Sequence, residues 1–282
     1  MLLDVRPRSR QPRTRSEIDW SHPLTRALRF AYTVDPARPF GDLVSGRNGM
    51  PVGVTRLTVT PHGGGLSFDL AGALLDFGDG GIPNAGGGPF SVFFLVQVPT
   101  VFAYRDAGLS AGGGQNAYAW GIYDVNLFLV FPGLATILGT SIVTAGHLYA
   151  VGITYSPGTG VRFFSRNLST HAIVFETVAT AALPGPTFPR SSLSGPNTWG
   201  GPLMFTYTFD RLLSDQEFLA LSFEPYAFVR PVRPWWQIKH VWDTVPRVAL
   251  PARERVFEVS AKARIFGVPA TSRMFEMEGR RS

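Results

Sequence analysis

The chain has 282 residues, of which 45% are hydrophobic and 16% are charged, a globular composition that excludes disorder over most of the length. It contains no cysteine, which excludes a disulfide framework and a thiolate metal site. The formal net charge of +6 is uneven: residues 1–18 carry +3, residues 19–228 carry −3 and residues 229–282 carry +6. The sequence therefore predicts a mildly acidic body between two basic end segments.

The first 18 residues are rich in Arg and Pro and show no periodicity, so we expect a basic, extended N-terminal arm over 1–18. The apolar opening is too short for the hydrophobic region of a signal peptide, and the Arg residues follow it rather than precede it. No stretch of the chain approaches the roughly 18 apolar residues of a membrane span. We expect a protein that is neither exported by the general secretory route nor inserted in a membrane.

Residues 19–228 alternate short apolar runs with Gly- and Pro-rich turns, which is typical of an all-β domain. Runs such as FSVFFLVQV and LYAVGITY are almost continuously apolar, as expected of central strands that are covered on both faces of a sandwich. We expect strands at 27–32, 66–70, 74–77, 90–98, 118–122, 127–131, 148–155, 161–165, 172–178 and 203–209.

One stretch, LLSDQEFLALSFEPYAF, carries a helix signal near the end of this region. Ser214 is a good N-cap, and Glu217 follows it three residues later, which is the spacing of a capping box. Apolar residues continue until Pro225, which ends the helical pattern. The sequence predicts a helix of two or three turns that begins after Ser214.

Residues 229–282 form the predicted C-terminal docking tail, in which an Arg-x-Phe-x-Val/Met pattern recurs three times at nine-residue steps. The side chains of one copy share a face because side chains of a strand alternate with period two. Strands this short are not stable alone, so we expect them to add to the sheet edge of a partner, with Phe as the anchor. The candidate partner-binding residues are Arg255, Phe257, Val259, Arg264, Phe266, Val268, Arg273, Phe275, Met277 and the preceding Trp235, Trp236 and Trp242.

Five stretches over roughly 20–228 stand in the order of a known family. They are WSHPLTRALRFAY, GGGLSFDLAGALLDFGD, GPFSVFFLVQVP, TAGHLYAVGITYSPGTGVRFFSRN and MFTYTFDRLLSDQEFLALSFEPYAF. This region resembles a laminin-G-like, concanavalin A-like lectin/glucanase domain of the kind found in tailed-phage structural proteins. The resemblance implies a jelly-roll β-sandwich of two antiparallel sheets, with the small helix near the last strand.

Two departures from the family pattern fall in surface loops, where the ligand sites of the family tend to lie. Ser156 replaces the usual Asp, and Ser165-Arg166-Asn167 replaces the usual Asn-Gly hairpin. They put a carry-over of function in doubt more than a carry-over of fold.

The resemblance makes glycoside hydrolysis a candidate activity, because some members of the family cleave glucans. This chemistry needs two carboxylates beside the scissile bond, about 5–5.5 Å apart in retaining enzymes. The only Glu residues of 19–228 are Glu176, Glu217 and Glu224, and no predicted strand places two acids on one face at a suitable spacing. We therefore expect no enzyme and no catalytic residue, with a glycoside hydrolase as the remote alternative.

A Gly-rich loop contains Asp76, Asp79 and Asn84, whose hard oxygen atoms could hold Ca²⁺. The favoured interpretation is a turn in which these side chains bond to the local backbone, so no cofactor is expected. Aromatic and amide side chains near predicted strand ends could instead bind a glycan, although a core position is the commoner role for such aromatics. The candidate glycan-binding residues are Trp120, Tyr123, Asn126, Asn197 and Trp199.

The resemblance implies a virion protein of a bacteriophage, and the two basic end segments favour assembly with neighbouring subunits. We therefore expect a non-enzymatic virion protein, in first place a capsid decoration protein, assembled in the host cytoplasm. Its expected partners are other virion proteins (the major capsid protein or tail components) and further copies of itself. Nucleic-acid binding ranks lower, because the repeats hold Arg at a fixed strand register that suits a protein edge. The main alternative is a glycan- or receptor-binding module of a tail fibre or baseplate.

Overall fold

The structure is a computed structural model that describes residues 11–12, 15–35, 37–53, 55–60, 63–68, 73–79, 88–99, 105–110, 118–123, 125–131, 135–180, 190–193 and 201–232. The chain divides into two compact units, Met1–Val232 and Arg233–Ser282, and every described residue belongs to the first. The expected division into arm, sandwich and tail stays a prediction, because most of the two end segments lies outside the described ranges.

Apart from the pair of β1 and β17, the described strands form two antiparallel sheets. One contains β3 (Met50–Val52), β6 (Leu74–Asp79), β8 (Arg105–Ser110), β9 (Tyr118–Tyr123), β10 (Asn126–Phe131), β11 (Ala135–Ile142) and β15 (Arg190–Leu193). The other contains β2 (Leu28–Thr33), β4 (Thr55–Thr60), β5 (Gly63–Phe68), β7 (Phe90–Gln97), β12 (Leu148–Ser156), β13 (Gly160–Asn167), β14 (Ile173–Val178) and β16 (Leu203–Phe209). The remaining elements are β1 (Ser16–Ile18), the 3-10 helix η1 (Pro23–Thr25), α1 (Asp215–Phe223) and β17 (Val229–Pro231).

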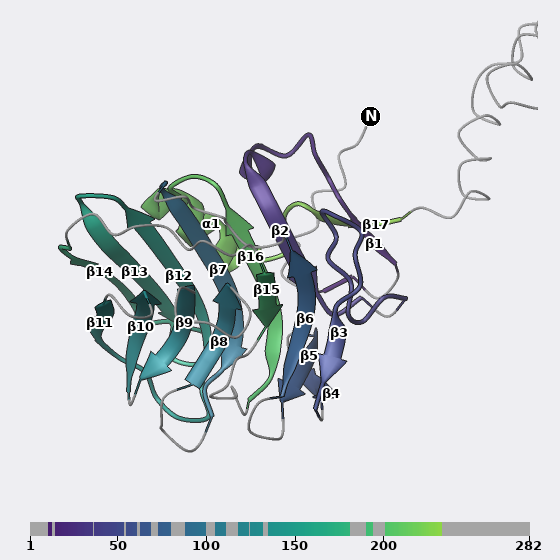
Figure 1. Cartoon of the computed structure of the whole chain (residues 1–282), viewed down its shortest axis with the longest axis horizontal. Helices are drawn as coiled ribbons and strands as arrows, with labels where there is room; N and C mark the ends of the chain where they lie inside the picture. The colour runs from purple at the N-terminus through teal and green to yellow at the C-terminus, as the bar shows by residue number, and fades with distance from the viewer. Residues whose placement is uncertain are drawn as a thin grey trace, which may run out of the picture. The chain divides into compact units, whose positions relative to one another are not determined.

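The two sheets face each other as the layers of a sandwich (Figure 1). The strand order is β11-β10-β9-β8-β15-β6-β3 in the seven-stranded sheet. It is β14-β13-β12-β7-β16-β5-β4 in the eight-stranded sheet, where β2 also pairs with β16. The predicted all-β sandwich is therefore confirmed, and each of the ten predicted strands has a counterpart in it.

The main hydrophobic core lies between the sheets. On β7 the inward residues are Val92, Phe94 and Val96, all fully buried, and they pack in one cluster with Trp120 of β9 and Tyr155 of β12. Because side chains alternate across a strand, the intervening residues of β7 point to the outer face of the eight-stranded sheet.

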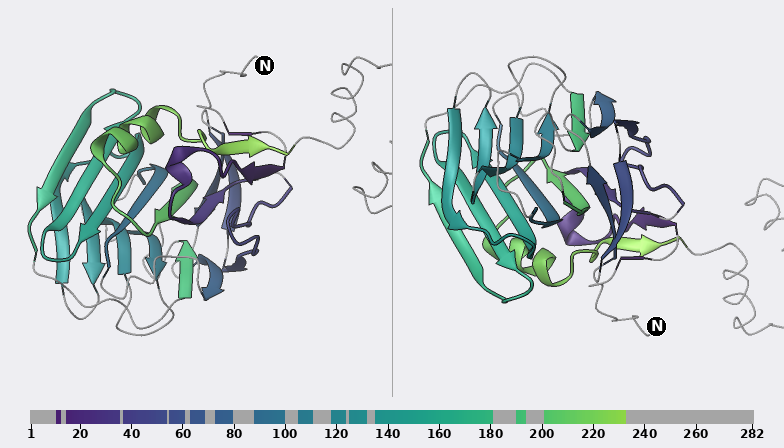
Figure 2. Two further views of the ribbon diagram at one scale, coloured as in Figure 1. Left: turned by 90° about the horizontal axis from the view of Figure 1, so that it is seen from above. Right: turned by 90° about the horizontal axis from the view of Figure 1, so that it is seen from below.

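A second hydrophobic cluster covers that outer face. Phe93 of β7 and Phe164 of β13 contact Phe218 of α1 there, with ring centroids 6.0 and 5.5 Å from it. A Cβ atom at Gly152 of β12 would lie 2.4 Å from the Phe218 ring, so the missing side chain lets α1 approach the sheet. Figure 2 shows α1 on this face. Cover on both faces explains why β7 and β12 are almost continuously apolar.

The helix α1 begins as predicted. The Ser214 hydroxyl accepts a hydrogen bond from the Glu217 backbone N–H, and the Glu217 carboxylate accepts one from the Ser214 backbone N–H. The predicted capping box is therefore confirmed. In the described part of the chain, no helix has both the length and the hydropathy that a membrane crossing needs.

The strands β1 and β17 pair with each other although about 210 residues separate them in the sequence; we call this pair the clasp (Figure 2). Its antiparallel register aligns Ser16 with Pro231 and Ile18 with Val229. Ile18 and Val229 are buried in the second cluster, so the clasp is packed onto the sandwich. The Asp35 carboxylate also accepts a hydrogen bond of 2.6 Å from the Ser16 backbone N–H.

Polar contacts close the clasp on its exposed side. The Arg230 guanidinium makes an ion pair of 2.8 Å with Glu17, and its second nitrogen lies 3.8 Å from Asp19. The backbone N–H of Val232 donates a hydrogen bond of 2.8 Å to the carbonyl oxygen of Arg15. The last described residues before the C-terminal unit therefore lie beside the end of the predicted N-terminal arm.

Candidate binding pocket

The predicted glycan-binding residues do not form one site in the structure. Trp120 is a correction: its side chain is fully buried in the main core, because β9 turns it inward opposite Leu129 of β10. A sugar cannot stack on it. Tyr123 is 46% exposed and pairs across the β9–β10 turn with the half-buried Asn126, so these two side chains remain accessible. Asn197 and Trp199 lie outside the described residues.

The tail also lies outside the described residues, so its predicted docking role stays a prediction. This applies to Arg255, Phe257, Val259, Arg264, Phe266, Val268, Arg273, Phe275, Met277, Trp235, Trp236 and Trp242.

The loop proposed for Ca²⁺ is described only in part. The Asp76 carboxylate is buried and accepts a hydrogen bond of 2.9 Å from the backbone N–H of Gly78, which is the local bond expected of a turn. The Asp79 side chain and Asn84 lie outside the described part. Within the described residues, no group of three or more His, Asp or Glu side chains is placed to hold a metal ion.

Two of the three glutamates considered for catalysis make structural contacts. Glu176 of β14 reaches across to β11, where its carboxylate accepts hydrogen bonds from the backbone N–H groups of Thr140 and Ser141 and from the Ser141 hydroxyl. Burial raises the pKa of Glu176, but these hydrogen bonds outweigh it and lower the pKa below its usual value. The contact joins the edges of the two sheets. Glu217 caps α1, as described above.

A pocket that sequence reasoning did not predict lies beside the N-terminal end of α1. Its volume is about 510 Å³, and its walls come from residues 20–23, 25 and 26 before β2, from Arg211 after β16 and from Glu217 of α1. We call it the Trp20 pocket. Trp20 and Arg211 are separated by about 190 residues, so only the folded chain brings these walls together.

Hydrogen bonds within the first wall fix its backbone. The Asp19 carboxylate accepts hydrogen bonds from the Ser21 hydroxyl, at 2.6 Å, and from the Ser21 backbone N–H. His22 is the N-cap of η1 and accepts from the Leu24 N–H through Nδ1, and Pro23 follows at the first helical position. The hydroxyl of the buried Thr25 donates a hydrogen bond of 2.7 Å to the His22 carbonyl oxygen. This wall is therefore a rigid turn.

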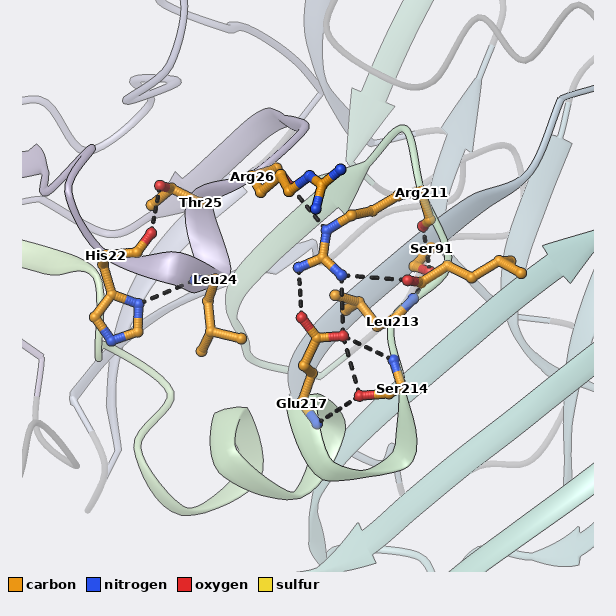
Figure 3. Close-up of polar contacts among 10 residues, drawn as sticks. His22, Leu24, Thr25, Arg26, Ser91, Arg211, Leu213, Ser214 and Glu217 are labelled. Atoms are coloured by element: carbon orange, nitrogen blue, oxygen red, sulfur yellow. Dashed lines mark hydrogen bonds and ion pairs between the residues drawn. The ribbon is translucent and has the colours of Figure 1, made fainter.

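The second wall is held by Arg211, which lies between the Arg26 backbone and Glu217 (Figure 3). Arg211 Nε donates a hydrogen bond of 2.9 Å to the Arg26 carbonyl oxygen. Its two terminal nitrogens bind the two Glu217 carboxylate oxygens at 2.7 and 2.9 Å. The Arg211 hydrogen bond lowers the pKa of Glu217 against the opposing effect of burial. The buried Ser91 hydroxyl of β7 donates to the Arg211 carbonyl oxygen at 2.7 Å and anchors this wall to the sheet.

Two side chains of the pocket are left to solvent. The Trp20 side chain is 58% exposed, and the exposed Arg26 guanidinium has no hydrogen-bond or ion-pair partner among the described residues. Arg211 is neutralised by Glu217, so Arg26 supplies the excess positive charge of the pocket. The arrangement combines an aromatic surface with an unpaired cation, which suits binding rather than acid–base chemistry. The signal in the sequence is Trp20 itself, an aromatic residue in a polar turn before the first apolar run.

Comparison with solved structures relates the fold to carbohydrate-associated proteins. Domain 4 of AbnA, a GH43 extracellular arabinanase from Geobacillus stearothermophilus in complex with arabinotriose, is similar with a TM-score of 0.52 at 12% identity, over 69% of this chain and 98% of that domain. Trypanosoma rangeli sialidase in complex with sialic acid is similar with a TM-score of 0.50 at 12% identity, over 72% of this chain and 33% of the sialidase. The binding domain of botulinum neurotoxin DC in complex with SialylT is similar with a TM-score of 0.50 at 13% identity, over 72% of this chain and 52% of that chain.

At these identities the likeness shows the fold alone, that of a β-sandwich found in glycan-binding and glycosidase-like proteins. The chain spans nearly all of the arabinanase domain but only a third of the sialidase and about half of the toxin domain. No family model and no curated protein matches the sequence.

Proposed function

We propose that the protein is a non-enzymatic structural protein of a tailed-phage particle, in first place a capsid decoration protein that its two basic end segments anchor to neighbouring subunits. The phage assignment rests on the resemblance of residues 20–228 to domains of phage structural proteins. The anchoring rests on one observation, the clasp, which joins the bases of both end segments on the body.

The clasp places the residue before the C-terminal basic segment, Val232, beside Arg15 of the N-terminal basic segment. Residues 1–15 contain five Arg and one acid, and residues 233–282 contain ten Lys or Arg and five acids. A hydrogen bond joins Val232 to Arg15, and further along the N-terminal segment the Gln11 side chain hydrogen-bonds Thr33 and Gly64 of the body. Two weak contacts carried by one chain can engage one neighbour together, and their combined affinity then exceeds that of either contact.

The roles of the glutamates support a non-enzymatic protein. Glu176 and Glu217 are held by backbone hydrogen bonds, and the pKa of each is lowered. A general acid in a glycosidase needs the opposite, a raised pKa that keeps the carboxyl group protonated near neutral pH. Neither residue is suited to that role.

Replacing the three repeat anchors Phe257, Phe266 and Phe275 by Ser in the full chain tests the anchoring. We expect the amount of protein recovered on purified particles to fall at least about tenfold, because anchor residues dominate the energy of such contacts. The matched control replaces Val241, Val245 and Val248, which are apolar tail residues outside the repeats, by Ser. Thermal unfolding of both variants checks that the sandwich is intact. Normal incorporation of the Phe variant would contradict the proposal.

A second candidate function, a glycan-binding module of a tail fibre or baseplate, is favoured by the Trp20 pocket. Exposed aromatic side chains beside polar groups are suited to sugars, whose C–H faces are apolar and whose edges carry hydroxyl groups. The arabinanase domain and the toxin binding domain share the fold and are seen in complexes with arabinotriose and SialylT. This function is compatible with the first, since a decoration protein can present a binding site at the particle surface.

A further inference from the structure

We propose that the Trp20 pocket binds a sugar that carries a carboxylate group, such as a uronic acid. The inference rests on the second proposed function, glycan binding, and adds to it the site and the chemical class of the ligand. Three properties of the pocket carry it: the aromatic side chain, the cation that has no partner among the described residues, and the polar groups that line the same pocket.

Trp20 supplies the surface on which the sugar ring stacks. The Trp20 side chain is 58% exposed and lines the pocket, so its indole ring is accessible for stacking. Its backbone is held in place, since the Trp20 carbonyl oxygen accepts a hydrogen bond from the Thr25 hydroxyl at 3.3 Å and the neighbouring Asp19 and Ser21 are bonded to each other. A rigid aromatic group loses little conformational entropy on binding.

Arg26 supplies the charge that selects a carboxylate. The planar guanidinium group binds a carboxylate through two parallel hydrogen bonds, a geometry that a neutral hydroxymethyl group cannot reproduce. The Arg26 carbonyl oxygen receives the Arg211 hydrogen bond, so its backbone is fixed to the second wall. Arg211 does not compete for the ligand because both of its terminal nitrogens already bind Glu217.

Ser21 supplies a group for a sugar hydroxyl. The Ser21 hydroxyl donates a hydrogen bond to the Asp19 carboxylate, so its oxygen can still accept one from a ligand. His22 accepts the Leu24 N–H at Nδ1 and lines the pocket next to Ser21. The volume of about 510 Å³ lies within the usual range for small-molecule sites and accommodates one or two sugar units.

A peptide carboxylate is the competing ligand, since it would also bind Arg26. The pocket favours the sugar because it is open and its lining combines Trp20 with polar and charged side chains, rather than forming an enclosed apolar hole for a side chain. The experiment below includes a peptide so that the two ligand classes give different results.

The test measures binding to the full-length protein of two sugars that differ only in the carboxylate, methyl β-D-glucuronide and methyl β-D-glucoside, by ligand-observed NMR titration. We expect the glucuronide to bind about tenfold more tightly than the glucoside, as one charge-assisted bidentate contact provides. Arg26→Gln is expected to remove this preference and leave the weak glucoside binding unchanged, while Trp20→Ala is expected to abolish both. Arg56→Gln, the same charge change on β4, is the control and should bind as the unmodified chain does.

The outcomes separate this inference from the function on which it rests. Equal binding of both sugars, lost in Trp20→Ala, would overturn the choice of an acidic sugar and leave glycan binding intact. Binding of neither sugar would overturn glycan binding at this pocket. Tighter binding of the peptide N-acetyl-Gly-Gly than of the glucuronide would overturn the sugar in favour of a protein ligand. Thermal unfolding of Trp20→Ala and Arg26→Gln shows whether each variant is folded, and both are expected to melt within about 2 °C of the unmodified chain because both side chains are exposed.

Discussion

Each end of α1 is bound by an arginine side chain, but the surroundings of the two arginines differ. At the C-terminal end, Arg166 of β13 is buried, donates a hydrogen bond of 2.8 Å to the Ser222 carbonyl oxygen and lies 3.6 Å from the centre of the Phe223 ring. At the N-terminal end, Arg211 is likewise paired, but the adjacent Arg26 is exposed and unpaired among the described residues. The first end is a structural joint. The second is a structural joint beside which the side chains of Trp20 and Arg26 are exposed.

The largest effect that this comparison predicts is at the closed end. Arg166→Ala should lower the free energy of unfolding by about 2 kcal/mol, because it leaves a buried carbonyl oxygen without a donor and removes the contact with Phe223. The measurement is urea denaturation of the full chain. Arg166→Met retains much of the apolar stem and is expected to recover part of the loss. An unchanged midpoint for the Ala variant would show that the C-terminal joint is not needed for stability.

A smaller, pH-dependent effect is expected at the open end. Glu217→Gln should lower the free energy of unfolding at pH 7 by about 1 kcal/mol, since it removes the charge that binds Arg211 and weakens the cap of α1. The pKa of Glu217 is lowered in the folded chain, chiefly by its hydrogen bond from Arg211. Its charge therefore stabilises the protein above the unfolded-state pKa of about 4.3, and this stabilisation is lost as the pH falls through the folded-state pKa.

The check is a pair of thermal unfolding series between pH 7 and pH 3, for Glu217→Gln and for the unmodified chain. The two curves should converge at the acidic end. A constant difference in melting temperature across this range would mean that the Glu217 charge has no part in the joint. Arg26→Gln, at the same end of α1 but outside the joint, is the control and should follow the unmodified chain at every pH.

Most of the fold could be predicted because the apolar sequences of the core strands indicate that these strands are buried. β7 and β12 read as continuous apolar runs, and the capping box marks α1 locally. Three of the strands that were not predicted, β4, β1 and β17, have a different origin. β4 lies at the edge of its sheet, with the sequence TRLTVT and no buried residue. β1 and β17 have three residues each and are strands only because the fold brings distant segments together.

The site was less predictable, because the face to which a side chain points and the residues that it contacts are determined only in the folded chain. The polar turn around Trp20 is a local signal, but nothing local indicates that Trp120 points inward, opposite Leu129 of β10. The departure from the family pattern at Arg166 and Asn167 was expected to affect a ligand loop. Both residues instead have structural contacts: the Asn167 side chain accepts hydrogen bonds from two backbone N–H groups of the following turn, and Arg166 reaches α1.

The most direct test of the proposed function is a cryo-EM map of the phage particle that contains the protein. The proposal predicts the sandwich at the particle surface, with residues 233–282 added as strands to a neighbouring subunit and the rings of Phe257, Phe266 and Phe275 buried in that neighbour. A map in which this segment packs against its own sandwich, with those rings buried inside one copy, would contradict it.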